Sequence, residues 1–529
     1  MKLNVSKKYL EVPVSANAVR KKLVFYVNGE LVFDMDTTMD TVSPEYFQYI
    51  NLERFIGSEI EIKCDPEVDF DLKETNEVQE DIKLYEKYRP NVHFSSRRGW
   101  INDPNGLYYN DGVYHMFFQY NPVSKDWGNM HWGHAVSRDL FHWEQLECAL
   151  YPDELGTMFS GSAIVDTENV SGLKVNENDV VILYYTAAGN NSILSKEKKF
   201  TQGMAYSIDG GKTFEKYSKN PIIVHIEAEN RDPKVIFCTE INQYLMALYL
   251  NDNRFTVYSS KNLLDWEPMH QVVLPEDSEC PDMYPLYIDG DSEKMKWVFS
   301  GASDRYLIGD MTKGKFIPSQ TAKKLHYGNS SYAAQSFSNT GERRIRIAWN
   351  TMRVPDSYFN CSMCIPTDMS LKNINGEDSL CLMPVSEIKD LYNNVTEQSD
   401  IIVDKGAENT VLLDCSETKA FDFDLLLSAN TDSEFSISVF GLKIKFDVKE
   451  NSIACFDKTM PICMDGDKIK LRMIADTLGL ELFAGEGQAH MCMGFLCDYA
   501  LNKLKIKADK GCIKIINCKT AGLNNINNK

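Results

Sequence analysis

The sequence predicts an all-β protein with a five-bladed β-propeller, a C-terminal β-sandwich and a small N-terminal β unit. Three observations carry this prediction. Apolar and polar residues alternate with a period of two over several short runs, as in half-buried strands. No long helical period interrupts residues 89–391, where Gly, Asn and Asp turns separate the runs. A similar hairpin recurs at intervals of about 50–70 residues.

The N-terminal unit is expected over residues 1–85. Lys21–Asp36 alternates around Asn28-Gly29, a dipeptide that favours the tight turn of a β-hairpin. A second strand-like run follows at Ser58–Asp65. The acidic stretch Glu67–Glu86 has few large apolar residues, which is typical of a linker or a solvated helix.

The middle unit is expected over residues 86–395. The runs Gly133–Leu146, Gly203–Tyr217 and Phe255–Met269 each contain a strand, a Ser, a turn with Asp or Asn, an aromatic residue and a second strand. Their spacing matches a four-stranded propeller blade, and the length fits about five blades. Any all-β protein forms such hairpins, so the repeat alone leaves other all-β folds open.

The C-terminal unit is expected over residues 400–529. Plain alternation in Glu434–Val448 and two further strands in Lys468–Gly487 indicate a β-sandwich. The last residues, Thr520–Lys529, are polar and are expected to fray.

Charge and composition exclude some function classes. A net charge of −20 argues against nucleic-acid binding and against docking on anionic membranes. The N-terminus lacks the apolar core of a signal peptide, so a cytoplasmic location is expected, with secretion left open. The 14 cysteines are expected to be reduced thiols. Oligomeric state is not readable from the sequence.

No metal site and no cofactor are expected. Cys361 and Cys364 form one CxxC pair, but no second pair or nearby His completes a zinc site, so chance spacing is favoured. His131 and His134 flank Trp132, and without a third ligand they are expected to be structural.

Three acidic residues occupy rigid, turn-like settings at the heads of predicted strands. Asp103 in WINDPNG and Asp232 in NRDPKVIF each precede a Pro, which favours extended backbone, and Glu279 lies in SECPDMYP. Taken singly, each is also compatible with an ordinary turn. In a propeller, however, the innermost strands all start at one end of the central channel, so the three would meet there. Paired carboxyl groups are what glycosidic-bond cleavage requires.

Two further blades start without a carboxylate. Phe159–Asp166 begins the second blade with small residues that leave room for a ligand, and Ser160 offers a hydroxyl group. The fifth blade is expected to begin near Tyr332–Ser338 and to continue to Asn350.

The motifs WINDPNG, FFQYNP (117–122), WGNMHWGHAVS (127–137), FSGS, RDP and EC stand in the order found in one family. With them the chain resembles glycoside hydrolase family 32, the β-fructofuranosidases that include invertases, inulinases, levanases and fructan exohydrolases. The resemblance runs from about Tyr88 into the C-terminal sandwich, and more loosely into the N-terminal unit. The stretch YRPNVHFSSRRGWINDPNG (88–106), with the extra N-terminal β unit, looks most like the bacterial levanase or fructan β-fructosidase branch.

The resemblance implies roles for individual residues. Asp103 would be the nucleophile, Glu279 the general acid and base, and Asp232 a stabiliser of the transition state. In retaining enzymes the nucleophile and the acid lie about 5–5.5 Å apart. The remaining implied substrate-binding residues contribute hydrogen bonds, pocket walls or a charge contact to the acids: Asn102, Gln119, Trp127, Phe159, Ser160, Arg231 and Trp349. Cys280, beside Glu279, is expected to tune the acid rather than to react.

The implied function is retaining exo-β-fructosidase activity on sucrose and fructo-oligosaccharides, with inulin and levan as further candidates. Sucrose 6-phosphate hydrolase, fructosyltransferase and a non-catalytic carbohydrate-binding propeller remain alternatives. A five-bladed arabinan-type hydrolase also uses two Asp and one Glu, but Gln119 and FSGS speak against it. Asn350 departs from the Met that the family often has after Trp349, which leaves chain-length preference open.

Overall fold

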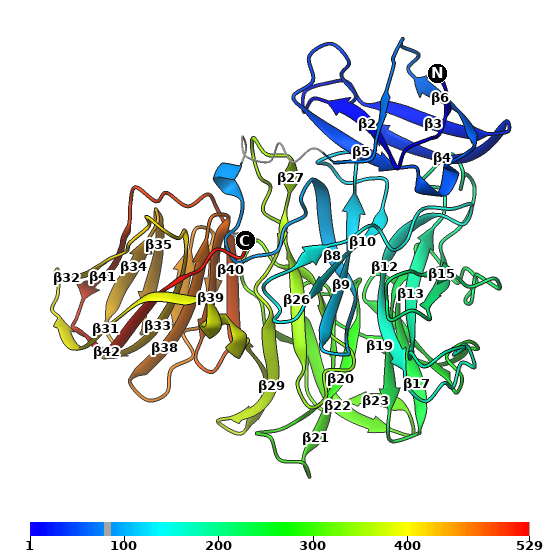
Figure 1. Ribbon diagram of the computed structural model, residues 1–529. Coiled ribbons are helices and arrows are strands. Elements are labelled where there is room, and N and C mark those ends of the chain that lie inside the picture. Colours follow the sequence, from blue (N-terminus) through cyan, green and yellow to red (C-terminus); the bar gives the residue numbers. More distant parts are fainter. Residues whose placement is uncertain (79–85, 528–529) are drawn as a thin grey trace.

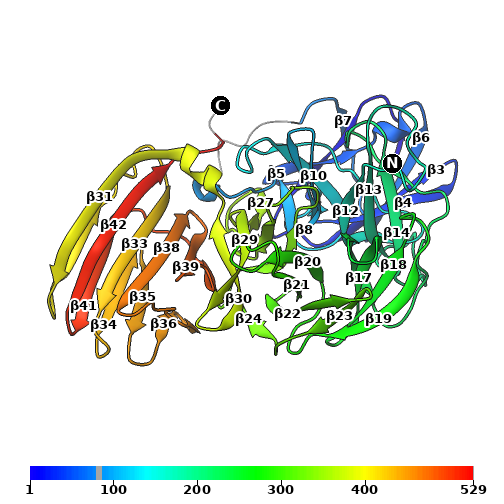
Figure 2. The ribbon, with the colours of Figure 1, turned by 90° about the horizontal axis from the view of Figure 1, so that it is seen from below.

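The computed structural model describes residues 1–78 and 86–527. Its sheets form three groups along the chain: an N-terminal unit, a propeller and a C-terminal sandwich (Figure 1). Seen from below, the sandwich and the N-terminal unit lie against different sides of the propeller (Figure 2). The predicted fold class is confirmed. No helix in the described parts of the chain is long and apolar enough to cross a membrane.

The N-terminal unit consists of two small sheets, in the orders β1-β6-β3-β4 and β5-β2-β7. The expected hairpin at Asn28-Gly29 is present, and both residues have positive φ, 51° and 82°. Part of the acidic stretch forms β7, and residues 79–85 of it lie outside the described residues. The strands are β1 (Lys2–Asn4), β2 (Tyr9–Val14), β3 (Lys21–Val27), β4 (Glu30–Thr37), β5 (Tyr46–Asn51), β6 (Glu59–Asp65) and β7 (Lys73–Thr75), and the 3-10 helices η1 (Glu53–Phe55) and η3 (Glu86–Tyr88) follow β5 and precede β8.

Five sheets make up the propeller, one for each blade. Their innermost strands, β8, β12, β16, β20 and β25, pack in sequence, and β25 packs on β8 to close the ring. The first three blades contain β8 (Gly99–Asn110), β9 (Val113–Asn121), β10 (His131–Ser137), β11 (Glu144–Gln145), β12 (Thr157–Asp166), β13 (Val180–Ala188), β14 (Thr201–Ser207), β15 (Glu215–Lys216), β16 (Arg231–Cys238), β17 (Gln243–Asn251), β18 (Arg254–Ser260) and β19 (Glu267–Val273).

The last two blades close the propeller against the first. The short β27 pairs in parallel with β8, so the fifth blade's connection also fastens the first blade. These blades contain β20 (Asp282–Tyr287), β21 (Met295–Ser300), β22 (Arg305–Thr312), β23 (Lys315–Pro318), β24 (Lys323–Lys324), β25 (Tyr332–Ser336), β26 (Ile345–Asn350), β27 (Phe359–Asn360), β28 (Ser362–Met363), β29 (Thr367–Ile374) and β30 (Glu377–Pro384).

The recurring hairpin in the sequence joins the third and fourth strands of the first three blades. In each copy the Ser that ends the third strand donates to a side chain two residues later. The Oγ–Oδ1 distances are 3.0 Å for Ser137–Asp139, 2.7 Å for Ser207–Asp209 and 3.2 Å for Ser260–Asn262. The repeat is therefore a turn motif in which the side chain satisfies local backbone and hydroxyl groups.

The sandwich has two six-stranded sheets, β31-β42-β33-β38-β39-β40 and β32-β41-β34-β35-β36-β37, around a core of its own. Its elements are η4 (Ser386–Leu391), β31 (Tyr392–Val403), β32 (Glu408–Leu412), β33 (Ala420–Ala429), β34 (Glu434–Val439), β35 (Leu442–Asp447), β36 (Ser452–Cys455), β37 (Lys458–Met460), β38 (Lys468–Asp476), β39 (Gly479–Ala484), β40 (Ala489–Gly494), β41 (Lys503–Lys510) and β42 (Ile513–Leu523).

The expectation of a frayed C-terminus is wrong for most of the segment. Residues 520–523 complete β42, which pairs with both β31 and β33. Beyond the strand, the Asn524 N–H donates to the Leu391 carbonyl (2.8 Å) and the Ile526 N–H to the Asn91 carbonyl (2.9 Å). Polar composition did not prevent ordering, because the backbone groups of a central strand are paired on both sides.

Buried charged side chains connect the sandwich to the propeller. Glu481, from β39, accepts from the Ile365 N–H (2.8 Å) and contacts His93 Nε2 (3.1 Å). Asp476, from β38, contacts His93 Nδ1 (2.9 Å) and accepts from the Val92 N–H (2.9 Å). We call Glu481, Asp476 and His93 the sandwich seam.

Candidate active site

A pocket of about 410 Å³ opens where the innermost strands of the blades begin. All ten residues singled out from the sequence line it, although they come from four blades and two loops. They are Asn102, Asp103, Gln119, Trp127, Phe159, Ser160, Arg231, Asp232, Glu279 and Trp349. The expectation that strand heads of one propeller converge at one end of the channel therefore holds for Asp103, Asp232 and Glu279.

Irregular strand pairing turns the site residues toward the pocket. The register of the innermost strand shifts at Ile101/Pro104 in the first blade, at Phe159/Gly161 in the second and at Arg231/Lys234 in the third. The proline after Asp103 and the one after Asp232 have no N–H to give to a ladder, which favours a bulge at these points. Bulges re-aim side chains, and here they point consecutive residues at the channel.

Several site residues have a backbone conformation that side chains other than Gly adopt infrequently. Asp232, Glu279 and Cys280 have φ values of 66°, 55° and 39°, and Ala333 in the fifth blade has 52°. Tertiary contacts hold this geometry. The Asp232 N–H donates to Thr186 Oγ1 (2.9 Å), and the Cys280 N–H donates to Asp232 Oδ2 (3.0 Å). Such clustering of strained residues is typical of functional sites.

Asp103 is held at both carboxyl oxygens. Ser160 Oγ donates to Oδ2 (2.7 Å) and Asn102 Nδ2 donates to Oδ1 (3.1 Å). Asn102 is itself fixed by Trp100 Nε1, which donates to its Oδ1 (2.8 Å). Burial raises the pKa of Asp103, and the nearby charge of Glu279 adds to this, while the hydrogen bonds oppose it. The carboxyl group is thus oriented rigidly and desolvated.

Arg231 lies between the other two acids. Its Nη2 is 2.9 Å from Glu279 Oε1 and its Nε is 3.8 Å from Asp232 Oδ2. Burial raises the pKa of Asp232, and the charges of Glu279 and Asp103 add to this, while Arg231 and the Cys280 N–H lower it. The net result is a pKa of about 7. One guanidinium group thus lies against two of the three carboxyl groups.

The Cys280 thiol lies close to two of the acids. Its Sγ is 3.6 Å from Asp103 Oδ2 and 3.5 Å from Asp232 Oδ2. Burial raises the pKa of this thiol well above its usual value, and the surrounding carboxylates add to the effect. The group therefore stays a thiol, which can donate to only one carboxylate at a time and is a poor nucleophile.

Aromatic side chains form the walls of the pocket. Trp127 stands edge-on to Phe159 with ring centroids 5.9 Å apart, and Phe159 stands edge-on to Phe200 at 5.5 Å. On the other side, Trp349 packs against Trp100 at 5.8 Å. Trp127 is 47% exposed, so its ring has a free surface at the pocket mouth. Broad aromatic surfaces of this kind suit the apolar face of a sugar ring.

Four lining residues were not found from the sequence: Asn191, Phe200, Glu229 and Tyr332. Tyr332 Oη donates to Glu279 Oε2 (3.2 Å). It begins the innermost strand of the fifth blade, so the strand-head rule that picked out the acids could have found it too. Asn191 and Glu229 lie on connecting segments, and no local pattern marks them.

The N-terminal unit makes hydrogen bonds to two propeller loops that carry residues of the pocket lining. Asp34, in β4, accepts through Oδ1 from the Ile193 N–H (2.8 Å), two residues after Asn191. The Asn129 side chain accepts from the Asp36 N–H (2.9 Å) and donates to the Asp36 carbonyl (2.7 Å), two residues after Trp127. Both loops are thereby fixed from outside the propeller.

Possible ligands for a metal gather away from this pocket. Within the described residues, Cys364, Glu481 and Cys492 bring ligand atoms within 4.8 Å of one another at the propeller–sandwich contact. Both oxygens of Glu481 already have partners in protein groups, Ile365 N–H, His93 and His490. His131 and His134 are buried with lowered pKa values and contact the Asn129 carbonyl and His115 respectively.

Residues 93–384 match the family model described as glycosyl hydrolases family 32 N-terminal domain. A levanase from Bacillus subtilis is 30% identical over 478 residues, 81% of this chain and 69% of the levanase. An invertase from Schizosaccharomyces pombe is 32% identical over 65% of this chain and 64% of its own length.

Solved structures agree with the fold. A variant fructofuranosidase from Schwanniomyces occidentalis, complexed with fructosylnystose, has a TM-score of 0.74 at 26% identity and covers 85% of this chain and all (100%) of its own. An exo-inulinase from Aspergillus awamori has the same TM-score, 0.74, at 24% identity over 83% of this chain and 99% of its own.

Proposed function

Because the chain belongs to glycoside hydrolase family 32, we propose that it is a retaining exo-β-fructosidase. Its substrates are sucrose, fructo-oligosaccharides and the chain ends of inulin or levan. The observation that carries the proposal is the meeting of Asp103, Asp232 and Glu279 with Arg231 in one aromatic-walled pocket. Relatives named levanase, invertase and exo-inulinase support the fructoside class.

In the first step Asp103 acts as the nucleophile. Its carboxylate attacks the anomeric carbon of the terminal fructosyl unit while the bond to the leaving oxygen breaks, which gives a covalent fructosyl-enzyme. Ser160 and Asn102 hold the two oxygens of Asp103, so the attack begins from a fixed orientation. Burial in the pocket removes water that would otherwise solvate the carboxylate.

Glu279 gives the leaving oxygen a proton in the first step. In the second step it takes a proton from water, whose oxygen then attacks the anomeric carbon and frees Asp103. Arg231 and Tyr332 contact its two carboxyl oxygens. The Tyr332 hydroxyl can donate or accept, so it accommodates both protonation states that Glu279 passes through.

Asp232 stabilises the transition state without reacting. Positive charge develops on the fructosyl ring as the bond breaks, and an adjacent carboxylate attracts it. Its oxygens also accept hydrogen bonds from ring hydroxyl groups. The Cys280 N–H and Thr186 fix its position, so no reorganisation is needed during the reaction.

A substrate panel tests the proposal. The purified protein is given sucrose, sucrose 6-phosphate, 1-kestose, inulin and levan, and released fructose and transfer products are followed. We expect fructose from the unphosphorylated substrates. Fructose from none of the panel contradicts the proposal, exclusive use of the phosphorylated sugar favours the phosphate hydrolase, and longer products favour a transferase.

Two substitutions test the assigned roles. Asp103→Asn should lower kcat by about 10³–10⁵-fold because no covalent intermediate forms. Glu279→Gln should lose the least activity on substrates with good leaving groups, because these groups depart without a proton. Asp111→Asn, in an exposed turn, is the matched control and should keep normal activity. Near-normal turnover by Asp103→Asn would show that the nucleophile is elsewhere.

A further inference from the structure

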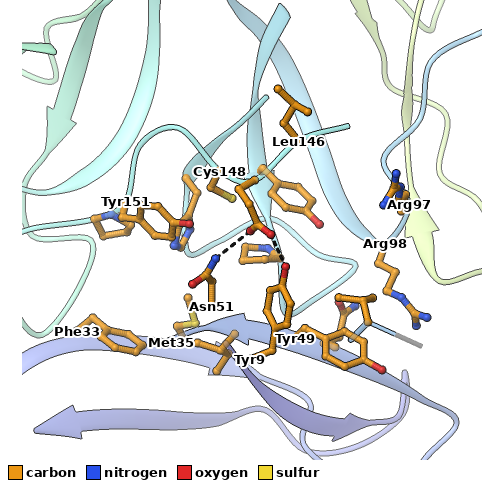
Figure 3. A pocket seen from close by; sticks show the side chains of 18 of the residues that line it. Tyr9, Phe33, Met35, Tyr49, Asn51, Arg97, Arg98, Leu146, Cys148 and Tyr151 are labelled. Atoms are coloured by element: carbon orange, nitrogen blue, oxygen red, sulfur yellow. Dashed lines mark hydrogen bonds between the residues drawn. The ribbon is translucent and has the colours of Figure 1, made fainter. Parts of the chain in front are cut away.

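A second cavity, of about 380 Å³, lies between the N-terminal unit and the first blade (Figure 3). Its volume falls in the range of small-ligand sites, about 300–1,000 Å³. In strand β9, Gln119 lines the catalytic pocket and the next residue, Tyr120, lines the second cavity. Successive residues of a strand point to opposite faces, so the blade separates the two cavities.

Aromatic side chains from both units surround the cavity. Tyr9, Phe33 and Tyr49 come from the N-terminal strands, and Tyr120 and Tyr151 come from the propeller. Figure 3 shows Tyr9, Tyr49 and Phe33 below the space and Tyr151 above it. Tyrosine offers an apolar ring with a hydrogen-bonding tip, a combination that suits a ligand with both apolar faces and hydroxyl groups.

A histidine of the lining offers a hydrogen-bond acceptor. His131 contacts the Asn129 carbonyl through Nδ1, and its lowered pKa keeps the ring neutral, which makes Nε2 an acceptor.

Two arginines provide donors. Neither Arg54 nor Arg97 forms an ion pair within the described residues, and both line the cavity. The Arg54 guanidinium lies over the rings of Phe33 and Tyr151, 5.4 Å and 5.2 Å from their centroids. Stacking keeps the group in place while its N–H edges remain available to a ligand.

The charges of the lining are mixed: it contains three arginines, Arg54, Arg97 and Arg98, and two acidic residues, Asp34 and Glu147. Glu147 accepts from Tyr9 and from Asn51 Nδ2 (2.9 Å), as the dashed lines in Figure 3 show, and it pairs with Lys8 (2.9 Å). Burial raises the pKa of Glu147, but these hydrogen bonds outweigh that effect and lower it, so the group is ionised. An anion would meet this carboxylate, whereas a neutral polyol uses donors and acceptors together.

We infer that this cavity is a second, non-catalytic binding site for a neutral sugar chain. The identity of that chain as a fructan rests on the proposed function. The site holds a chain segment on the propeller's flank by stacking on tyrosines, by donation from Arg54 and Arg97 and by acceptance at His131.

Titration calorimetry of the Asp103→Asn protein with 1-kestose and short inulin oligosaccharides tests this inference, because hydrolysis is blocked. We expect two sites. Adding Arg54→Ala and Arg97→Ala should weaken one of them by about tenfold or more, as expected for two lost charged hydrogen bonds. Arg138→Ala, an exposed arginine outside both cavities, is the matched control and should change neither site.

Activity of the otherwise native protein separates this inference from the proposed function. The Arg54→Ala/Arg97→Ala protein should keep its kcat/KM on sucrose and lose about threefold or more on inulin or levan. A single site in the Asp103→Asn protein, or two sites that the cavity variants leave unchanged, overturns the second site while hydrolysis continues. Binding of sugar phosphates alone in the second cavity would overturn the inference that its ligand is neutral. Failure to hydrolyse any fructoside contradicts the proposed function instead.

Discussion

The catalytic pocket and the sandwich seam each bury acidic side chains, yet the pKa values of Asp103 and Asp232 in the pocket shift one way and that of Glu481 in the seam shifts the other. In the pocket, burial raises the pKa of Asp103 and raises that of Asp232 to about 7. In the seam, burial also raises the pKa of Glu481, but hydrogen bonds and charge from His490 and His93 outweigh it and lower the pKa strongly. The buried carboxyl groups of Asp103 and Asp232 thus bind a proton more readily than usual, and that of Glu481 binds one less readily.

The difference lies in the partners supplied to each cluster. In the pocket, one guanidinium group, from Arg231, contacts two of the three carboxyl groups, whereas the two in the seam are met by imidazoles and backbone N–H groups. The strained φ values belong to the pocket as well. Unbalanced charge and strain reduce stability and prepare the site for chemistry, while the seam uses balanced charge to hold two domains together.

Among substitutions that test this difference, the largest expected effect is a loss of stability at the seam. Glu481→Gln should reduce the free energy of unfolding by about 3–5 kcal/mol, since it leaves the buried His93 with one carboxylate instead of two. Denaturant titration measures the change. The exposed Glu417→Gln is the control and should stay within about 0.5 kcal/mol of the parent. A Glu481 variant as stable as the control would mean that the seam contributes nothing.

Replacing a carboxylate by its amide in the pocket should instead lower activity and raise stability. Asp232→Asn should lower kcat by about 10²–10³-fold, because the developing positive charge loses its partner. It should also raise the free energy of unfolding at about pH 8 by about 1–3 kcal/mol. The Asp232 pKa is raised from its ordinary 3.8 to about 7 in the folded protein, so the folded state loses stability as pH rises through that interval.

Thermal or denaturant unfolding at several pH values checks the second part. The stability gain of Asp232→Asn should vanish below about pH 4, where the parent carboxyl is protonated in both states. Loss of stability at every pH would show that the charge of Asp232 is well compensated, and the contrast between pocket and seam would fail.

The seam has its own pH signature. Hydrogen bonds and charge from Asp476 and Glu481 outweigh burial and raise the pKa of His93 from 6.5 to about 10. A raised folded-state pKa gives stability that is complete below about pH 6.5 and is lost as pH rises through about 10. The free energy of unfolding should therefore fall between these values, and fall less in His93→Gln. Parallel pH profiles of the two proteins would contradict the assignment.

The smallest effect is expected where the N-terminal unit holds a pocket loop. Asp34→Asn keeps the shape of the side chain but weakens the charge-assisted bond to the Ile193 N–H. We expect KM for 1-kestose to rise about threefold, with kcat little changed, because Asn191 on that loop lines the pocket mouth. Asp69→Asn, exposed in the same unit, is the control. An unchanged KM would limit the N-terminal unit to other roles.

Local patterns were sufficient for much of the site. Asp103-Pro104 and Asp232-Pro233 carry their geometry in the dipeptide, since proline removes a ladder donor and restricts the residue before it. Tyr332 shows the limit of that approach. It occupies an equivalent strand head, which the sequence places, but its contact with Glu279 is visible only in the tertiary structure.

The sequence by itself determined the all-β class, the propeller with its flanking β units, the family and ten of the residues that line the pocket, because strand period, turn dipeptides and motifs are local. Only the tertiary structure decided how Cys280 lies against Asp103 and Asp232, that Glu481 ties the sandwich to the propeller, and that a second cavity faces the N-terminal unit. These features join residues from separate sheets. Their distances and their shared burial, which set the pKa values, exist only once the sheets have packed.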